Sequence, residues 1–489
     1  MNKHLQRMRT GIPGLDVILG GGFVEGASYI VQGQPGAGKT IFANQVAFSA
    51  VAAGRKVLYV TLLAETHDRL FQSLGTLDYF DRSKLGVALS YVSVFQTLRD
   101  KGLAAVVDLL RKETQRQKAT LLVFDGLLNA KDRGHSDLDV KTFVAEVQSQ
   151  AAFVGCTVLF LTSAGVATDS PEHTMVDGVL ELHDEMTGVR SVRRLRVRKS
   201  RGSAALAGHH QYEISSAGMT VYPRLEAELA YPSVADEPEA RRISATIKGL
   251  DGLLGGGLPH GSTTVLYGPT GGGKTSLGLG YLSGATAEEP ALHFGFYETP
   301  TRLLAKAASV GIDLQGPLSS GNLEVIWQPM TENLVDKLGH RLLEAVRRRN
   351  VKRLFIDGLA GFERAAAHSS RLVEFYAALT NELRAHGVTT IASLELRDLF
   401  GPNVAAPGPE VSSLIDNLIL VRNVELESRY TRIISILKVR DGIPQTALHE
   451  LKFGNSGLEV ALPLVPVAGA VTGVAEPLGA TDSDERTHS

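Results

Sequence analysis

Apolar and polar positions along the chain alternate in a way that predicts strands and helices in turn. Five short runs rich in apolar, β-branched and aromatic residues are typical of buried parallel strands: 27–32, 56–62, 88–92, 120–125 and 157–161. Apolar residues at helical spacing lie between them, for example over 103–116 and about 140–153. Because strands and helices alternate, we expect an α/β fold built on a mostly parallel sheet that helices cover.

The pattern changes near residue 178. Short stretches of alternating apolar and polar residues follow at 179–182, 191–197 and 211–214. Alternation with a period of two is typical of strands with one exposed face. We therefore expect an antiparallel extension along one edge of the sheet.

The second half of the chain repeats the first. Apolar strands are predicted again at 263–267, 292–296, 354–357 and 389–393, with a late hairpin of 417–424 and 431–438. The segment 12–23 returns as 247–258, and the offset is constant, because 251 − 16 and 274 − 39 both equal 235 for the pairs Asp16/Asp251 and Lys39/Lys274. A repeat of this size indicates domain duplication.

The repeat and the local composition divide the chain into four parts. We expect a first domain over 1–224, an exposed linker rich in Ala, Glu, Asp and Pro over 225–242, and a second domain over 243–462. Residues 463–489 are rich in Pro, Gly and Ala and then acidic, which predicts a disordered tail.

Each copy contains a complete G-x-x-x-x-G-K-[ST] pattern between a predicted strand and a predicted helix. The residues expected to bind nucleotide phosphates are Gly33, Gly36, Ala37, Gly38, Lys39 and Thr40, and Gly268, Gly271, Gly272, Gly273, Lys274 and Thr275. Glycines let backbone N–H groups approach phosphates, and a helix N-terminus adds positive potential. The lysine then reaches the terminal phosphates, and the threonine hydroxyl ligates Mg²⁺. A glycine-rich turn could match once by chance, but two matches at one offset indicate ATP and Mg²⁺ as cofactors.

Carboxylates recur at matching places in both copies. Asp125 and Asp357 each end an apolar strand, where they could ligate Mg²⁺ directly or through water, or simply close a turn. Their recurrence favours the metal role. Glu65 and Glu298 follow the next strand and are candidates to polarise the attacking water. The alternative for both glutamates is a favourable charge in the first turn of a helix.

Basic residues close the late hairpin of each copy. Lys199 with Arg201 and Lys438 with Arg440 could contact the local nucleotide or, in a ring, the γ-phosphate of a neighbour. The first pair belongs to a basic run over 190–201, which could suggest nucleic acid. Because these residues alternate along a strand and no aromatic residue lies among them, a solvated face is favoured and nucleic-acid binding is not expected.

Composition narrows the class of protein. The 489 residues carry 50 Lys and Arg against 52 Asp and Glu, so no global basic field attracts nucleic acid or anionic membrane. No apolar run approaches the roughly 20 residues that span a bilayer, and no signal peptide is recognisable. Cys156 is the single cysteine, which excludes an internal disulfide and a cysteine metal cluster. We expect a soluble cytoplasmic protein.

Taken together, these motifs resemble the KaiC family of circadian clock ATPases within the RecA-like superfamily. The likeness covers roughly residues 10–460 and includes the G-[IV]-x-G-L-D-x-[IL]-L-G-G-G opening. The first glycine of this pattern is present in the first copy as Gly11 and is replaced by Thr246 in the second. It implies two tandem RecA-like P-loop domains, ATP at subunit interfaces, a homohexameric double ring and regulatory protein partners.

The resemblance also assigns roles to particular residues. It implies that Lys199, Arg201, Lys438 and Arg440 reach across the subunit interface, and it places Ser412 and Ser413 at the family's phosphorylation pair. In that family the first ring is mainly an ATPase and the second also phosphorylates itself. Where the family has two adjacent glutamates, this sequence has Ala64 and Tyr297 at the first position, so each copy retains one glutamate.

Three functions are consistent with the sequence. The first is an ATP-hydrolysing ring that autophosphorylates on serine and acts in signalling or timing. The second is a RecA/RadA-type DNA-dependent ATPase, but the loops at 165–172 and 403–410, where DNA would be contacted, lack a Lys/Arg cluster. The third is a signalling scaffold in which nucleotide only assembles the ring.

Overall fold

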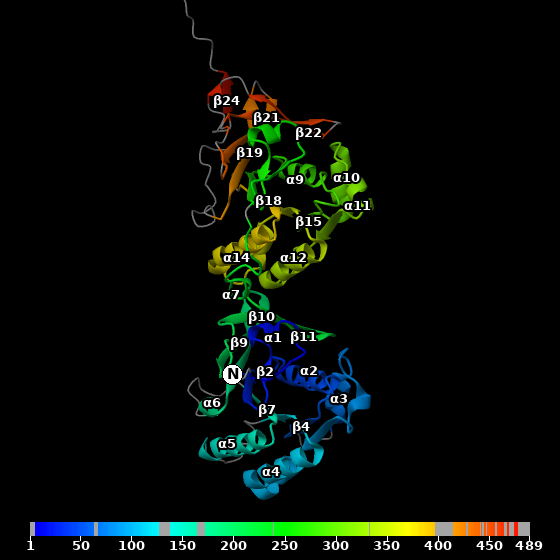
Figure 1. The fold of residues 1–489 in the computed structure, drawn as a ribbon, viewed down its shortest axis with the longest axis vertical. Coiled ribbons are helices and arrows are strands. Elements are labelled where there is room, and N and C mark those ends of the chain that lie inside the picture. The colour runs from blue at the N-terminus through cyan, green and yellow to red at the C-terminus, as the bar shows by residue number, and fades with distance from the viewer. Residues whose placement is uncertain are drawn as a thin grey trace, which may run out of the picture. The chain divides into compact units, whose positions relative to one another are not determined.

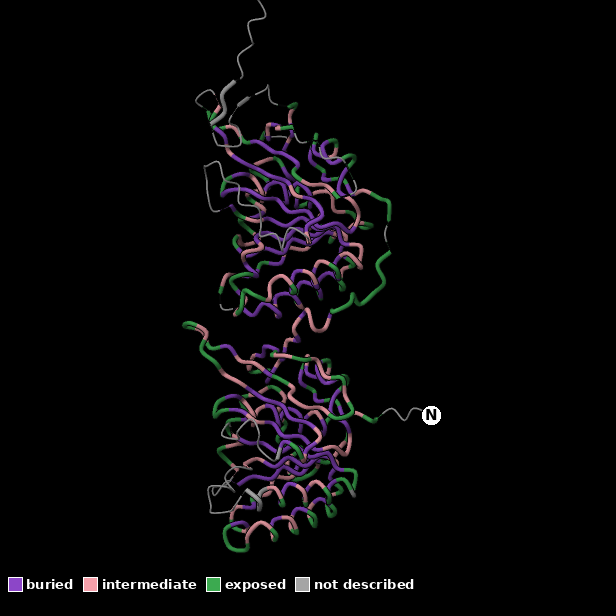
Figure 2. The backbone as a smooth tube through the Cα atoms, turned by 90° about the vertical axis from the view of Figure 1, so that its left-hand side faces the viewer, coloured by how far each residue is buried: buried purple, intermediate pink, exposed green. Residues whose placement is uncertain are grey.

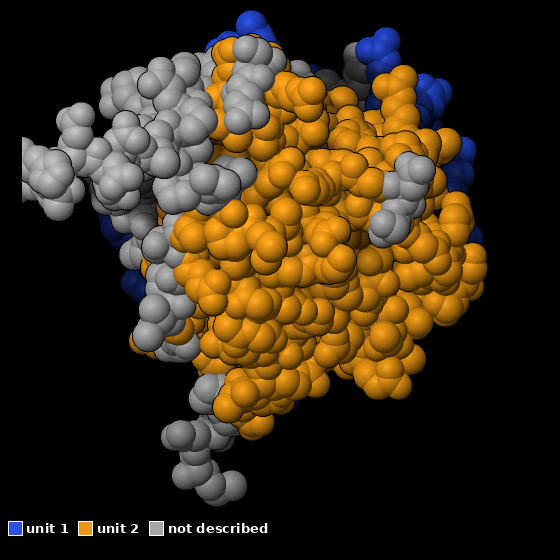
Figure 3. Space-filling view, turned by 90° about the horizontal axis from the view of Figure 1, so that it is seen from above, with its two compact units in different colours: residues 1–228 blue, residues 229–489 orange. Residues whose placement is uncertain are grey.

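The structure is a computed structural model of the whole chain. It describes residues 5–477 apart from these segments: 63–66, 127–136, 164–171, 238, 332, 397–413, 427–428, 441, 443–444, 446, 455–456, 464–466 and 469–473. The chain forms two compact units, Met1–Glu228 and Leu229–Ser489 (Figure 3). Each unit is an α/β domain with helices packed along a central sheet (Figure 1).

The sheet of the first unit has nine strands in the order β11-β10-β9-β8-β3-β7-β6-β4-β5. Six of them form the parallel part: β3 Ser28–Gly33, β4 Val57–Thr61, β5 Leu89–Ser93, β6 Leu121–Asp125, β7 Thr157–Ser163 and β8 Gly178–Thr187. Three form the antiparallel edge: β9 Arg190–Ser200, β10 His209–Ser215 and β11 Gly218–Tyr222. The predicted parallel sheet with an antiparallel extension is confirmed.

The second unit repeats this order strand for strand as β22-β21-β20-β19-β14-β18-β17-β15-β16. Its strands are β14 Thr263–Gly268, β15 Ala291–Gly295, β16 Leu323–Trp327, β17 Arg353–Asp357, β18 Thr389–Glu395, β19 Asn417–Leu426, β20 Arg429–Lys438, β21 His449–Gly454 and β22 Gly457–Pro463. The duplication read from the sequence is therefore a duplication of the fold. Two further strands, β23 Val467–Ala468 and β24 Val474–Pro477, lie within the range for which we expected a disordered tail, and β24 pairs with β19.

Helices cover both faces of the first sheet. The longer helices of this unit are α2 Lys39–Ala52, α3 Asp68–Leu74, α4 Phe95–Gln117 and α5 Asp137–Phe153. Because side chains alternate along a strand, Tyr29 and Val31 pack with Phe42 of α2, whereas Ile30 packs with Val106 of α4 on the opposite face. Both faces are apolar, and the central strands β3, β4, β6 and β7 are buried along nearly all of their length (Figure 2).

The second unit has the corresponding helices α9 Lys274–Leu282, α10 Pro300–Ser309, α12 Val335–Arg349 and α14 Leu372–Ala385. The remaining short elements are β1 Arg7–Met8, α1 Leu15–Ile18, β2 Phe23–Val24, α6 Glu172–Met175, α7 Leu225–Glu228, β12 Arg242–Ile243, α8 Leu250–Leu253, β13 Leu258–Pro259, α11 Gln315–Ser319, α13 Ala360–Ala365 and 3₁₀ turns at Arg82–Lys84 and Ser369–Arg371. Among the helices of the described segments, none is long and apolar enough to cross a membrane.

Helix α4 begins eight residues before the start we predicted at Leu103. Gly102 lies inside it with φ 76° and ψ −176°, so the backbone leaves the helical conformation at that residue. A glycine adopts this conformation without strain, and Gly102 separates the helical residues 95–101 from the amphipathic part that follows. In the sequence, apolar residues recur at helical spacing only after Gly102, which is why the predicted helix began at Leu103.

Candidate nucleotide-binding sites

In both units the phosphate-binding loop joins the central strand to the first long helix. Gly33 ends β3 and Lys39 begins α2, and Gly268 and Lys274 stand in the same positions in the second unit. The lysine turns back over its loop: Lys39 Nζ donates to the Gly33 carbonyl at 2.7 Å, and Lys274 Nζ donates to the Gly268 carbonyl at 2.7 Å. Phosphate oxygens could accept from the same ammonium groups. Burial lowers the pKa of both lysines, although nearby carboxylates oppose this shift.

The glycine before each helix is required by the backbone. Gly38 has φ 89° and Gly273 has φ 100°, a region that residues with a Cβ rarely adopt. A Cβ at Gly38 would lie 2.5 Å from Ile214 Cδ1, and a Cβ at Gly273 would lie 2.7 Å from Phe453 Cζ. The loop is thus packed against the antiparallel edge of its own sheet, and its shape depends on these glycines.

A carboxylate at the end of a neighbouring strand faces the threonine of each loop. Thr40 Oγ1 donates to Asp125 Oδ2 at 3.3 Å, and Thr275 Oγ1 donates to Asp357 Oδ1 at 3.3 Å. Burial raises the pKa of both aspartates and outweighs the hydrogen bonds and the nearby lysine charges that would lower it. A hydroxyl and a carboxylate oxygen are hard ligands of the kind Mg²⁺ prefers, so the residues present fit this ion.

The two aspartates are supported by different side chains. In the first unit the hydroxyl of Tyr59 donates to Asp125 at 3.1 Å. In the second unit the hydroxyl of Ser393, on β18, donates to Asp357 at 2.9 Å. His293 takes the strand position of Tyr59, with Nε2 4.0 Å from Asp357 Oδ2, and burial lowers its pKa to about 3, so the ring is neutral. We did not predict these supporting residues from the sequence.

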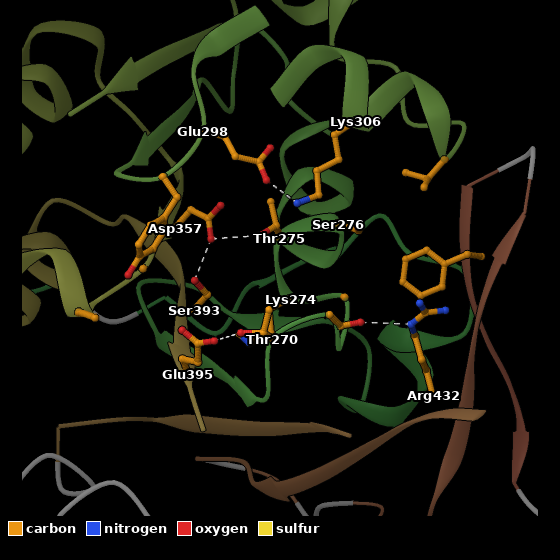
Figure 4. Close-up of a pocket in the computed structure, with 17 residues that line it drawn as sticks. Thr270, Lys274, Thr275, Ser276, Glu298, Lys306, Asp357, Ser393, Glu395 and Arg432 are labelled. Carbon is orange, nitrogen blue, oxygen red and sulfur yellow. Dashed lines mark hydrogen bonds and ion pairs between the residues drawn. The ribbon is translucent and has the colours of Figure 1, made fainter. Parts of the chain in front are cut away.

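The second unit has a cavity of about 530 Å³ over its loop (Figure 4). This volume is in the range of small-molecule sites. Lys274, Thr275 and Asp357 line it, together with the predicted catalytic residue Glu298. Glu298 Oε1 is 2.6 Å from Lys306 Nζ, a lysine of α10 that the sequence analysis did not select.

Two further groups at this cavity were missed. Glu395, at the end of β18, accepts a hydrogen bond from the hydroxyl of Thr270 in the loop. The guanidinium carbon of Arg432 lies 4.7 Å from the centre of the Phe453 ring, and Arg432 Nε donates to the Gly271 carbonyl at 3.4 Å. The guanidinium of Arg432 therefore stacks on the Phe453 ring, and these two flat groups form part of one wall of the cavity.

The hairpin lysines bind carbonyl groups of their own unit. Lys199 Nζ donates to the Val176 carbonyl at 2.6 Å, and Lys438 Nζ donates to the Ile415 carbonyl at 2.5 Å. Neither Lys438 nor Arg440 is among the described residues that line the cavity over the second loop. Their predicted contact with a neighbouring protomer stays a prediction.

The hairpin arginines face aspartates that hold the loop strand. Arg440 Nη1 lies 2.5 Å from Asp416 Oδ1, and the other oxygen of Asp416 accepts the backbone N–H of Thr263, the first residue of β14, at 2.8 Å. In the first unit Arg201 lies 3.9 Å from Asp177, which accepts the N–H of Ser28, the first residue of β3, at 2.9 Å. Burial alone would raise the pKa of Asp416, but the N–H and the arginines outweigh it and hold this pKa below its usual range.

The basic run of β9 faces acidic residues of β8. Arg193 lies 3.4 Å from Asp184, Arg194 lies 3.0 Å from Glu185, and Arg198 lies 3.5 Å from the buried Glu181. These ion pairs compensate much of the local positive charge, as expected for a solvated face. Glu65, Ser412 and Ser413 lie outside the described residues, so their predicted roles stay predictions.

Comparisons with known proteins agree with this geometry. A family model described as the ATPase KaiC matches residues 8–226 and 243–464, once for each unit. The circadian clock protein KaiC3 of Synechocystis sp. is 23% identical over 490 residues, which cover 96% of this chain and 94% of that protein. The circadian clock oscillator protein KaiC of Thermostichus vulcanus is 23% identical over 484 residues (96% and 92%), and that of Synechococcus elongatus is 22% identical over 473 residues (94% and 90%).

Proposed function

Because the chain belongs to the KaiC family of ATPases, we propose that it is a Mg·ATP-hydrolysing protein that assembles into a homohexameric double ring. One observation carries the proposal: the same hydroxyl–carboxylate pair, at 3.3 Å, lies beside a loop lysine in both units. An arrangement kept twice in one chain favours two working nucleotide sites. We place the ring in the cytoplasm, where it acts in signalling or timing together with regulatory protein partners.

Each group of the site has a part in phosphoryl transfer. Lys39 and Lys274 bind the terminal phosphates, and the backbone N–H groups of each loop cradle them. Thr40 with Asp125, and Thr275 with Asp357, would hold Mg²⁺, which supplies positive charge against the phosphate oxygens when bound. Glu65 and Glu298 orient the attacking water. In the ring, Lys199, Arg201, Lys438 and Arg440 complete the site of the adjacent protomer.

Turnover separates this proposal from a nucleotide-assembled scaffold. We expect Mg·ATP to give hexamers by light scattering and slow phosphate release in a steady-state assay. The double variant Glu65→Gln, Glu298→Gln should keep the hexamer and lose most of the turnover, because each change removes only the carboxylate charge. A protein that stays monomeric with Mg·ATP and binds no nucleotide would contradict the proposal, and hexamers without turnover would support the scaffold.

Autophosphorylation is a second candidate activity of the same ring. The sequence places Ser412 and Ser413 at the phosphorylation pair of the family, in the unit that has the described cavity over Lys274. We expect radiolabel from γ-labelled ATP to reach these serines, Lys274→Ala to abolish it, and Lys39→Ala to affect it only through ring assembly. An unlabelled wild-type protein would remove this activity from the proposal.

The alternative, a DNA-dependent ATPase, predicts that nucleic acid stimulates ATP hydrolysis, whereas our proposal predicts no stimulation. The arginines of β9 are engaged with Asp184, Glu185 and Glu181. We therefore expect single-stranded DNA to leave the ATPase rate unchanged at low salt. Stimulation that weakens steeply with added salt would favour a DNA-processing motor instead.

A further inference from the structure

Glu298 does not approach the second nucleotide site as an isolated carboxylate. Its Oε1 is 2.6 Å from the ammonium of Lys306, and the two side chains are 29% and 37% exposed. Both line the same cavity as Thr275 and Asp357, and the ion pair lies beside Thr275 in Figure 4. The residue proposed to orient water is therefore already bonded to a cation of its own chain.

The backbone fixes this pair. Glu298 precedes helix α10, Pro300 begins that helix, and Lys306 lies near the end of its second turn. Leu303 and Ala307 are buried and anchor the apolar side of α10, whereas Lys306 lines the cavity. The ammonium is close enough to influence Asp357 as well, and its charge opposes the raised pKa of that carboxyl.

In the sequence of the first unit, the position that corresponds to Lys306 is not a lysine or an arginine. The position eight residues after Glu65 is Ser73, on helix α3, just as Lys306 is eight residues after Glu298. The position four residues after each glutamate is an arginine in both units, Arg69 and Arg302. A cation eight residues after the glutamate is thus a feature of the second unit alone.

We propose that Lys306 is a positioning residue that holds the carboxylate of Glu298 in an ion pair and thereby slows ATP turnover at the second site. A carboxylate orients water through its lone pairs, and a bound ammonium occupies one of them and withdraws negative charge. This inference rests on the proposed function, because it takes Glu298 to be the water-orienting group. No covalent step is added to the reaction.

The test is a mutant cycle on the full-length hexamer, with Glu65→Gln present in every variant so that the measured turnover is that of the second site. Lys306→Ser installs the residue of the first unit, and we expect it to raise kcat for ATP about threefold or more with little change in KM. Lys306→Arg keeps the ion pair and should retain the wild-type rate. Arg302→Ser removes a charge from the same helix and should also leave the rate unchanged. Ion pairs this exposed contribute little to stability, so these variants should fold.

The cycle with Glu298 separates positioning from structure. In the Glu298→Gln background we expect Lys306→Ser to have no effect, because the carboxylate that it releases is absent. A rise of equal size in that background, or a wild-type rate for Lys306→Ser, would overturn the role of Lys306 while leaving the ATPase intact. A rise in KM alone would show that Lys306 binds nucleotide instead. Absence of turnover in every variant would overturn the proposed function itself.

Discussion

The carboxylate of Glu382 accepts hydrogen bonds from both the backbone N–H and the hydroxyl of Ser233, at 2.7 and 2.5 Å. Glu382 lies on α14 and is fully buried, and Arg347 of α12 contributes a further hydrogen bond at 2.7 Å. Ser233 belongs to the segment that the sequence predicts to be an exposed linker. The middle of that predicted linker is therefore fastened to the second unit.

This anchor should make the second unit sensitive to acid. Burial alone would raise the pKa of Glu382, but the hydrogen bonds from Ser233 and Arg347 outweigh it and hold the pKa below the ordinary value of 4.5. A lowered native pKa stabilises the fold fully above the ordinary value, and this contribution is lost as the pH falls through the native value. We expect Ser233→Ala to cost about 1.5 kcal/mol at neutral pH and less in acid.

The measurement can use the single tryptophan of the chain. Trp327 ends β16, so its fluorescence reports unfolding of the second unit. Urea titrations at several pH values would give the free energy of unfolding of wild type and Ser233→Ala. A loss of stability that is the same at every pH would contradict the anchoring role of the Glu382 charge.

The strand-end aspartates should set the metal dependence of nucleotide binding. We expect Asp357→Asn to weaken binding of Mg·ATP to the second unit about tenfold or more, because the amide cannot supply the negative charge that Mg²⁺ requires. Metal-free ATP should bind the variant as well as it binds wild type, or better. Titration with a fluorescent ATP analogue, in Mg²⁺ and in EDTA, would measure both affinities.

A matched variant controls for the loss of charge. Glu344→Gln removes an exposed carboxylate of α12, away from the cavity, and should leave both affinities unchanged. Asp125→Asn should reproduce the effect of Asp357→Asn in the first unit. Equal weakening of ATP binding with and without metal would argue against Asp357 as a metal ligand.

Gly273, the last glycine of the second loop, should tolerate no side chain. Gly273→Ala would adopt an unfavourable φ near 100° and would place its Cβ 2.7 Å from the Phe453 ring. The left-handed backbone alone costs about 1–2 kcal/mol, and the displaced loop should lose most of its affinity for ATP. Gly252→Ala is the control, because a Cβ there meets no atom within 4 Å and φ is not positive. Calorimetric titration with ATP and thermal melting of both variants would check this, and wild-type affinity in Gly273→Ala would contradict it.

The sequence predicted the sheet well because its central strands are buried on both faces. The runs 27–32 and 120–125 are each apolar at four of six positions, and they form β3 and β6 with boundaries shifted by at most one residue at each end. The loop lysines and threonines were predictable for a different reason. Their chemistry depends on a local pattern of eight residues that is the same in both copies.

The remaining site residues depend on contacts that no local sequence pattern indicates. Ser393 reaches Asp357 because β18 lies beside both β17 and β14, in a register that pairs Ser393 with Leu266. Lys306 lies only eight residues after Glu298, but that spacing does not by itself indicate an ion pair beside the cavity. Neither the Ser393–Asp357 contact nor the Lys306–Glu298 contact could be recognised from a local sequence motif. The same holds for Ser233, whose surroundings are polar and proline-rich but whose hydroxyl is held by α14.

The two copies differ in the side chain that supports the strand-end aspartate, Asp125 or Asp357. Its hydroxyl support comes from β4 in the first unit, through Tyr59, and from β18 in the second, through Ser393. A chimera that grafts one strand from one half into the other would therefore leave an aspartate with two supporting hydroxyls or with none. The two halves share one strand order, but single strands cannot be exchanged between them. A working chimera requires that the strands carrying the aspartate and its supporting hydroxyl be exchanged together.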